Sequence, residues 1–307
     1  MTLQLRRVVA DGLQVAVSRN GAVFAAVFLA VETLSLLLVL VASTSYIPVD
    51  LGAGIEPAGG IAVGSQLSEL TGLAATMLVG VFSAVVTVPI SIIAIRTFVA
   101  GATDTIPEGA LFNDLGRASG RGLVAMLCYT ATLFLIPFVT VLALFGVVAA
   151  AGTTEIVSGW VAGVVGLVVG GGLIVAAVAV GVVVWLQFLF LLHEIGVRGQ
   201  GVVDAFRGSW ATVRGSRLKL GVLALVLTSL RSGVSWAGSP TVEGGWTLLQ
   251  STTAAVSLIA SAVIGVVTMA ILARAYRDLR PEVDPDEPAE RGEAHGTDAT
   301  QGEPNPQ

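Results

Sequence analysis

Six long apolar stretches divide the chain, and shorter, more polar segments join them. A helix needs about 20 apolar residues to cross the hydrocarbon core of a bilayer, and each stretch approaches or exceeds that length. The predicted spans cover residues 21–42, 73–95, 123–150, 160–192, 220–236 and 254–276. The pattern therefore predicts an all-α fold, an integral membrane bundle of six transmembrane helices within residues 1–280.

Two of these stretches leave an alternative. The first could be a signal peptide, but its apolar core is longer than the roughly 7–15 residues usual there, so we expect a retained helix. The fourth is too long for one upright helix. Either it is tilted and protrudes, or the glycine run 170–172 divides a short outer element from the helix proper.

The basic residues lie in alternate connections between the spans. Arg and Lys occur before the first span, in 96–122, in 193–219 and after the last span, whereas connections 43–72, 151–159 and 237–253 contain none. Short cytoplasmic loops of membrane proteins carry an excess of Lys and Arg. We therefore expect a multi-pass protein of the cell (plasma) membrane, with its N- and C-termini in the cytoplasm.

Composition supports a membrane location and sets the last residues apart. The 307 residues are 54% hydrophobic and 12% charged, with a mean hydropathy of +0.87, whereas soluble domains carry about 25% charge. Residues 281–307 hold eight acids and one Arg among several prolines, which predicts a disordered acidic tail. Scarce Lys and surplus acids resemble proteins of salt-loving archaea, although a high-GC genome would also deplete Lys.

A short amphipathic stretch precedes each odd-numbered span. Apolar residues recur at a helical period within 4–18 and 202–214. Between them, Thr105 to Glu108 reads as a capping box with Pro107 in the first turn. We expect three interfacial helices in the cytoplasmic headgroup layer, each followed by two spans. The alternative is that any loop entering a membrane tends to be amphipathic and basic.

The third stretch shows the clearest division into faces. Its apolar residues are predicted to share one face, opposite its charged residues. These apolar residues are Val202, Val203, Phe206, Trp210 and Val213. Basic and aromatic residues of the three stretches and their entries to the spans are candidates for binding anionic lipid headgroups. They are Arg7, Arg117, Arg121, Arg207, Trp210, Arg214, Arg217 and Lys219.

Glu32 and Arg231 are charged residues well inside predicted spans. Such a charge costs on the order of 2.5–3.5 kcal/mol on insertion scales. Each lies roughly 17 Å from the basic edge of its span, at about 1.5 Å per residue, so the two could pair. The pair could be structural, the charges could be accommodated separately with Arg231 extending outward beside Trp236, or they could form a substrate or proton site.

The remaining polar and glycine signals are weaker. His193 and Glu194 end the fourth span, where an interfacial polar pair is favoured over metal or acid–base chemistry because no second His lies at zinc-site spacing. We expect no metal and no cofactor. Glycines four residues apart allow close helix packing, in a central helix or a self-association face. They are Gly159, Gly163, Gly166 and Gly170.

Two segments resemble known membrane proteins. One runs from 204 to 227 and contains Ala205, Phe206, Ser209, Trp210, Arg214, Gly215 and Arg217 before an apolar helix; the other is ARAYRDLR, 273–280. Together they resemble six-helix membrane proteins of haloarchaea and the membrane domain attached to some glycerophosphodiester phosphodiesterases. The resemblance implies an integral membrane module. The catalytic barrel of the phosphodiesterases has no counterpart here, so their hydrolytic activity does not carry over.

These observations favour a non-enzymatic integral membrane module that organises or binds lipids or partner proteins. The alternative is a small-solute transporter or permease with Glu32 and Arg231 in its pathway, for which a polar cavity at mid-membrane would be expected. Membrane lipids are the expected partners. The sequence leaves protein partners and a homo-oligomer open and gives no support for nucleic-acid binding.

Overall fold

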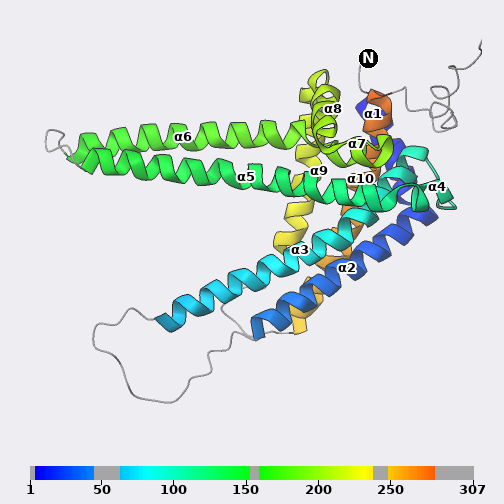
Figure 1. Ribbon diagram of the computed structural model, residues 1–307, viewed down its shortest axis with the longest axis horizontal. Helices are drawn as coiled ribbons and strands as arrows, with labels where there is room; N and C mark the ends of the chain where they lie inside the picture. Colours follow the sequence, from blue (N-terminus) through cyan, green and yellow to red (C-terminus); the bar gives the residue numbers. More distant parts are fainter. Residues whose placement is uncertain (1–3, 45–62, 153–158, 238–247, 281–307) are drawn as a thin grey trace, which may run out of the picture.

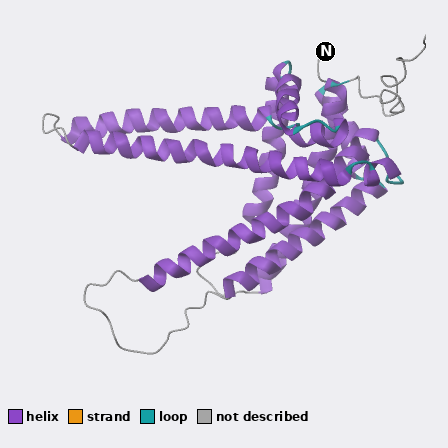
Figure 2. Cartoon of the chain, viewed as in Figure 1, coloured by secondary structure: helices purple, strands orange, loops and turns teal. Residues whose placement is uncertain are grey.

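The computed structural model describes residues 4–44, 63–152, 159–237 and 248–280. In these residues every regular element is a helix (Figure 2). In chain order the helices are α1 (Leu5–Ala16), α2 (Arg19–Thr44), α3 (Val63–Ala100), α4 (Glu108–Phe112), α5 (Leu115–Gly152), α6 (Gly159–Gln187), α7 (Leu191–Arg198), α8 (Val202–Arg214), α9 (Arg217–Ala237) and α10 (Leu248–Leu279). The predicted acidic tail lies outside the described residues.

Five of the described helical stretches are long and apolar enough to cross a membrane, which indicates a multi-pass membrane protein. They are Arg19–Val39, Met77–Ala100, Leu115–Ala149, Gly166–Arg198 and Thr252–Leu279. They correspond to five of the six predicted spans. The predicted fifth span forms α9, which is helical but is not among the five. Three cations, Arg217, Lys219 and Arg231, dilute the apolar character of α9.

The helices form two arms that diverge from a shared end (Figure 1). One arm is the long hairpin of α5 and α6, and the other contains α2, α3 and α10. Helix α9 packs on α10. The short helices α1, α4, α7 and α8 gather where the arms meet. We call this the basic end, because α2, α5 and α9 begin there, α3, α7 and α10 finish there, and most of the basic residues flank these termini.

The fourth apolar stretch is not divided at its glycine run. Helix α6 continues through Gly170, Gly171 and Gly172, and the break comes at residues 188–190, before α7. The alternative in which the glycines separate two elements is therefore wrong. Glycine weakens a helix in water by exposing the backbone to solvent, but lipid offers the backbone no other hydrogen-bond partner, so the helix persists.

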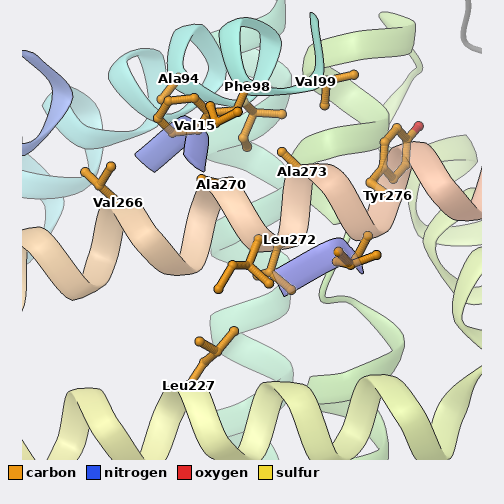
Figure 3. Close-up of a cluster of buried hydrophobic side chains, with 14 of the residues drawn as sticks. Val15, Ala94, Phe98, Val99, Leu227, Val266, Ala270, Leu272, Ala273 and Tyr276 are labelled. Atoms are coloured by element: carbon orange, nitrogen blue, oxygen red, sulfur yellow. The ribbon is translucent and has the colours of Figure 1, made fainter. Parts of the chain in front are cut away.

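A buried core holds the basic end together. Phe98 of α3 and Tyr276 of α10 are completely buried (Figure 3). They belong to a hydrophobic cluster to which α1, α2, α7 and α9 also contribute side chains. Helix α1 contacts α10 very closely at Gly12, where a Cβ atom would lie 2.7 Å from the Cα of Ile271. The glycine therefore allows the two backbones to meet.

The predicted middle amphipathic helix does not form as expected. Helix α4 has five residues, begins after Pro107 and has no side-chain capping hydrogen bond, so the predicted capping box from Thr105 is wrong. The backbone turns at Asp114 (φ 49°), a conformation that Asp tolerates better than most residues, and α5 begins directly afterwards. Amphipathic helices thus precede the first and fifth predicted spans as α1 and α8, whereas only one helical turn precedes α5.

Candidate functional site at the basic end

Helix α8 does not divide into the separate apolar and charged faces that its sequence predicts. It buries Ala205, Ser209, Thr212 and Val213, whereas Val203 and Trp210 remain 61% and 44% exposed. Small and hydroxyl side chains allow α8 to approach the break between α6 and α7 closely. The prediction that Val203 and Trp210 lie opposite the charged residues is therefore wrong, because both share the exposed side of the helix with Arg207 and Arg214.

Ser209 shows why a polar residue is buried in α8. Its hydroxyl donates a hydrogen bond to the carbonyl of Gln187 (2.7 Å) and accepts one from the amide of Phe190 (3.3 Å). These backbone groups lie at the break between α6 and α7, where the regular helical hydrogen bonds are interrupted. One hydroxyl thus satisfies two backbone groups at the break and holds α8 against it.

The exposed face of α8 carries an alternating apolar and cationic pattern, which we call the outer stripe. Its members are Val203, Arg207, Trp210 and Arg214, all exposed. Their spacing of four, three and four residues places them along one side of the helix. The guanidinium of Arg217 at the start of α9 lies 5.9 Å from the ring centroid of Trp210. This arrangement suits the headgroup layer of a membrane, where tryptophan rings and arginines are both favourable.

The other predicted headgroup residues are more dispersed. Arg7 on α1 pairs with Asp11 (3.7 Å), and Arg117 on α5 lies 3.9 Å from Asp114. Arg121 donates a hydrogen bond to the carbonyl of Gly199 (2.6 Å), so it joins α5 to the end of α7. The predicted residues of α8 and α9 therefore lie on two consecutive helices that meet where Arg217 approaches Trp210, whereas Arg7, Arg117 and Arg121 lie on α1 and α5.

The Glu194 cluster is a buried ionic site. Glu194 of α7 is completely buried, and its carboxylate lies 3.1 Å from Arg280 and 3.7 Å from Arg198. The hydroxyl of Thr212 donates to the same carboxylate (3.1 Å), and Arg280 donates to that hydroxyl (2.9 Å). The cluster therefore connects α7, α8 and the C-terminal end of α10, and a buried charge with several partners is costly to disrupt.

The sequence predicts an interfacial polar pair of His193 and Glu194 at the end of the fourth span, and the structure buries both side chains within the protein. His193 is 3% exposed and lies between the rings of Phe190 and Tyr276, at centroid distances of 5.4 and 5.3 Å. A signal for the cluster does exist in α8. A Cβ at Gly208 would come within 2.9 Å of the Glu194 carboxyl group, so a glycine in the middle of a charged helix marks the approach.

Within the bundle, the structure brings Glu32 and Arg231 together. The carboxylate of Glu32 on α2 lies 3.7 Å from the guanidinium of Arg231 on α9, and Ser261 of α10 donates a hydrogen bond to Glu32 (3.4 Å). Arg231 also lines a cavity of about 170 Å³ with Thr228 and Thr268. The described residues contain no group of three or more His, Cys, Asp or Glu side chains placed to hold a metal ion.

Only some of the α6 glycines that were predicted to pack closely lie against another helix. A Cβ at Gly170 would lie 3.2 Å from Leu144 of α5, which is tight packing within the hairpin. A Cβ at Gly166 would meet nothing within 4 Å. Gly159 and Gly163 belong to α6, but their surroundings lie outside the described residues.

Comparison with known protein families gives a match over most of the chain. The family model described as a domain of unknown function, DUF7847, matches residues 3–279. No curated protein and no solved structure matches the chain. The resemblance to haloarchaeal proteins and to the membrane domain of glycerophosphodiester phosphodiesterases therefore stays an expectation. Because the match covers all the described helices, the chain belongs to the DUF7847 family.

Proposed function

We propose that the protein is a non-enzymatic integral membrane module whose basic end binds anionic lipid headgroups of the cytoplasmic leaflet. The observation that carries the proposal is the outer stripe of α8. It exposes Trp210 between Arg207 and Arg214, with Arg217 over the indole. A soluble helix of this kind would turn its tryptophan inward, whereas the interfacial layer of a membrane favours both residue types.

The proposed topology adds α9 to the five apolar spans, which gives six spans, and places both ends of the chain in the cytoplasm. Helix α9 has 21 residues, close to the length needed to cross the bilayer. Arg217 and Lys219 lie in its first turn, at the basic end. The charge of Arg231, farther along the helix, lies within ion-pair distance of Glu32 of α2. The positive-inside rule then assigns the basic end to the cytoplasm.

Lipid preference in nanodiscs tests the proposal. The full chain is reconstituted with mixtures of phosphatidylglycerol and phosphatidylcholine, and spin-labelled lipids report which headgroup is enriched around the protein. Each basic residue near an anionic surface contributes about 1 kcal/mol, so replacing both Arg207 and Arg214 with Gln should reduce the preference for phosphatidylglycerol severalfold. The effect should shrink as salt rises.

A matched variant distinguishes the effect of the outer stripe from the effect of removing any positive charge at the basic end. Arg277→Gln removes an exposed charge at the same end but outside α8, and should change the preference less than either stripe substitution. Equal effects from Arg277→Gln and the stripe variants would refute a role for the stripe. If no headgroup is enriched at the stripe but a protein co-purifies through it, the same surface would instead bind a protein partner.

A small-solute transporter is the second candidate, favoured by the cavity that Arg231 lines with Thr228 and Thr268. Its volume of about 170 Å³ is small compared with the 300–1,000 Å³ of usual ligand sites. Glu32 forms the ion pair with Arg231 and does not line this cavity. Solute-dependent stabilisation of the wild-type protein, lost in Glu32→Gln and Arg231→Gln, would support transport over lipid binding.

A further inference from the structure

Helices α1 and α9 leave a groove between them because each packs on α10 rather than on the other. The close approach of Gly12 to Ile271 fixes α1 against α10. The groove has a volume of about 440 Å³, within the usual range for ligand sites. Its walls are formed chiefly by Leu5, Val9 and Leu13 of α1 and by Val222 and Val226 of α9, with Arg6 at its side.

The walls of the groove are apolar and open. Leu13, Val222 and Val226 are 42%, 53% and 58% exposed, although α1 and α9 are both anchored on the same helix. In α9 the wall begins one turn after Lys219, so the groove runs from the basic end toward the apolar part of the bundle. In the proposed topology this position corresponds to the boundary between headgroups and acyl chains.

Arg6 is the charged residue that lines this groove. Its side chain is exposed, and no carboxylate in the described part of the chain lies within ion-pair distance of it. The adjacent Arg7, in contrast, pairs with Asp11 (3.7 Å). An apolar groove beside a cation that has no acidic partner complements a ligand that joins an anionic group to a hydrocarbon chain.

We infer that the groove between α1 and α9 holds an acyl chain of one anionic phospholipid, whose phosphate binds Arg6. This rests on the proposed placement of the basic end at the cytoplasmic leaflet. It differs from the outer stripe in kind: the stripe attracts many exchangeable headgroups, whereas the groove retains one lipid by its chain and its phosphate together.

Native mass spectrometry of the full chain tests this inference. The protein is released from detergent containing phosphatidylglycerol or phosphatidylcholine with identical acyl chains, and the lipids that stay bound are counted as lipid concentration falls. Wild-type protein should retain one phosphatidylglycerol at concentrations at least tenfold below those at which phosphatidylcholine binds. Arg6→Gln should abolish the headgroup preference, and Val222→Trp, which fills the groove, should weaken retention of both lipids.

Two controls match these variants. Arg19→Gln removes another exposed arginine at the basic end, and Gln14→Trp adds the same bulk on α1 outside the groove. Both should retain the lipid like the wild type, and the melting temperature of every variant is measured to verify folding. The inference is wrong if Arg6→Gln keeps the preference, if Arg19→Gln loses it equally, or if a peptide or second copy occupies the groove instead of lipid.

The proposed roles of the groove and of the outer stripe can be refuted independently. Loss of the headgroup preference of the retained lipid in Arg6→Gln, with no effect of the Arg207 and Arg214 variants on surrounding lipid, would support the groove and refute the stripe. The opposite pattern would refute the groove and leave the proposed function standing.

Discussion

The two arms of the molecule are held in very different ways. In the most apolar 18-residue stretch of each helix, no α5 residue and 6% of the α6 residues are buried, compared with 11% in α2, 28% in α3 and 22% in α10. The other arm also contains polar contacts between helices, including the Glu32–Arg231 pair and the Ser35–Ser83 hydrogen bond (3.3 Å). The hairpin thus relies on its own pairing and on the basic end, whereas the other arm is a packed bundle.

The basic end supplies the contacts that fix the hairpin. Arg96 of α3 donates hydrogen bonds to the carbonyl of Gly196 within α7 (2.6 Å) and to that of Asn113, just before α5 (2.7 Å). Arg121 joins α5 to Gly199, and the Glu194 cluster joins α7 to α8 and α10. Substitutions at the basic end should therefore affect both arms, whereas substitutions along the hairpin should be tolerated.

The largest expected effect is at Glu194. Glu194→Ala leaves Arg280 without its buried carboxylate partner and should lower the free energy of unfolding by about 3–5 kcal/mol, measured by thermal unfolding in detergent. Asp204→Ala is the control, because it removes an exposed carboxylate paired with Arg207 and should cost less than about 1 kcal/mol. Similar melting temperatures for the two variants would show that the cluster does not hold the end together.

A pair of glycines tests the contrast between the arms directly. Gly12→Ala places a Cβ against the backbone of Ile271 and should cost about 1–3 kcal/mol of stability by overpacking. Gly166→Ala, on the hairpin, meets nothing within 4 Å and should leave the melting temperature unchanged or slightly raised. If Gly166→Ala is the more damaging variant, the hairpin is covered by a protein surface rather than by lipid.

The smallest expected effect is at the intramembrane pair. The side chains of Arg231 and Glu32 are 54% and 28% exposed at a separation of 3.7 Å. A double-mutant cycle of Glu32→Gln and Arg231→Gln should therefore give a coupling energy of only about 0.5–1 kcal/mol. A coupling energy indistinguishable from zero would mean that the two charges are accommodated separately.

Hydropathy predicts the long helices of this fold well, because a membrane span needs a long apolar run regardless of its neighbours. It predicts their surroundings poorly. In α8, Val203 and Trp210 lie on the same side as Arg207 and Arg214, so grouping the residues by polarity assigned them to the wrong face. Their exposure could not be read from their apolar character, because lipid and a protein core are both apolar.

The candidate site was only partly predictable for a related reason. The Arg and Trp residues of the third amphipathic stretch stood out by type and spacing, and Glu32 and Arg231 stood out by depth. Glu194 did not, because its partner Arg280 is distant in sequence and a Glu beside a span resembles an ordinary boundary residue. Burial of a charge depends on tertiary partners, which one sequence does not reveal.

The Glu194 cluster also has a consequence for how the chain is made. Glu194 is synthesised well before Arg280, so its carboxylate cannot meet that partner until all of α10 has left the ribosome. Until then α7 and α8 can associate, but the junction with α10 stays open. Closure of this ion pair therefore comes late in biogenesis, and nascent chains stalled before α10 should remain exposed to membrane quality-control proteases.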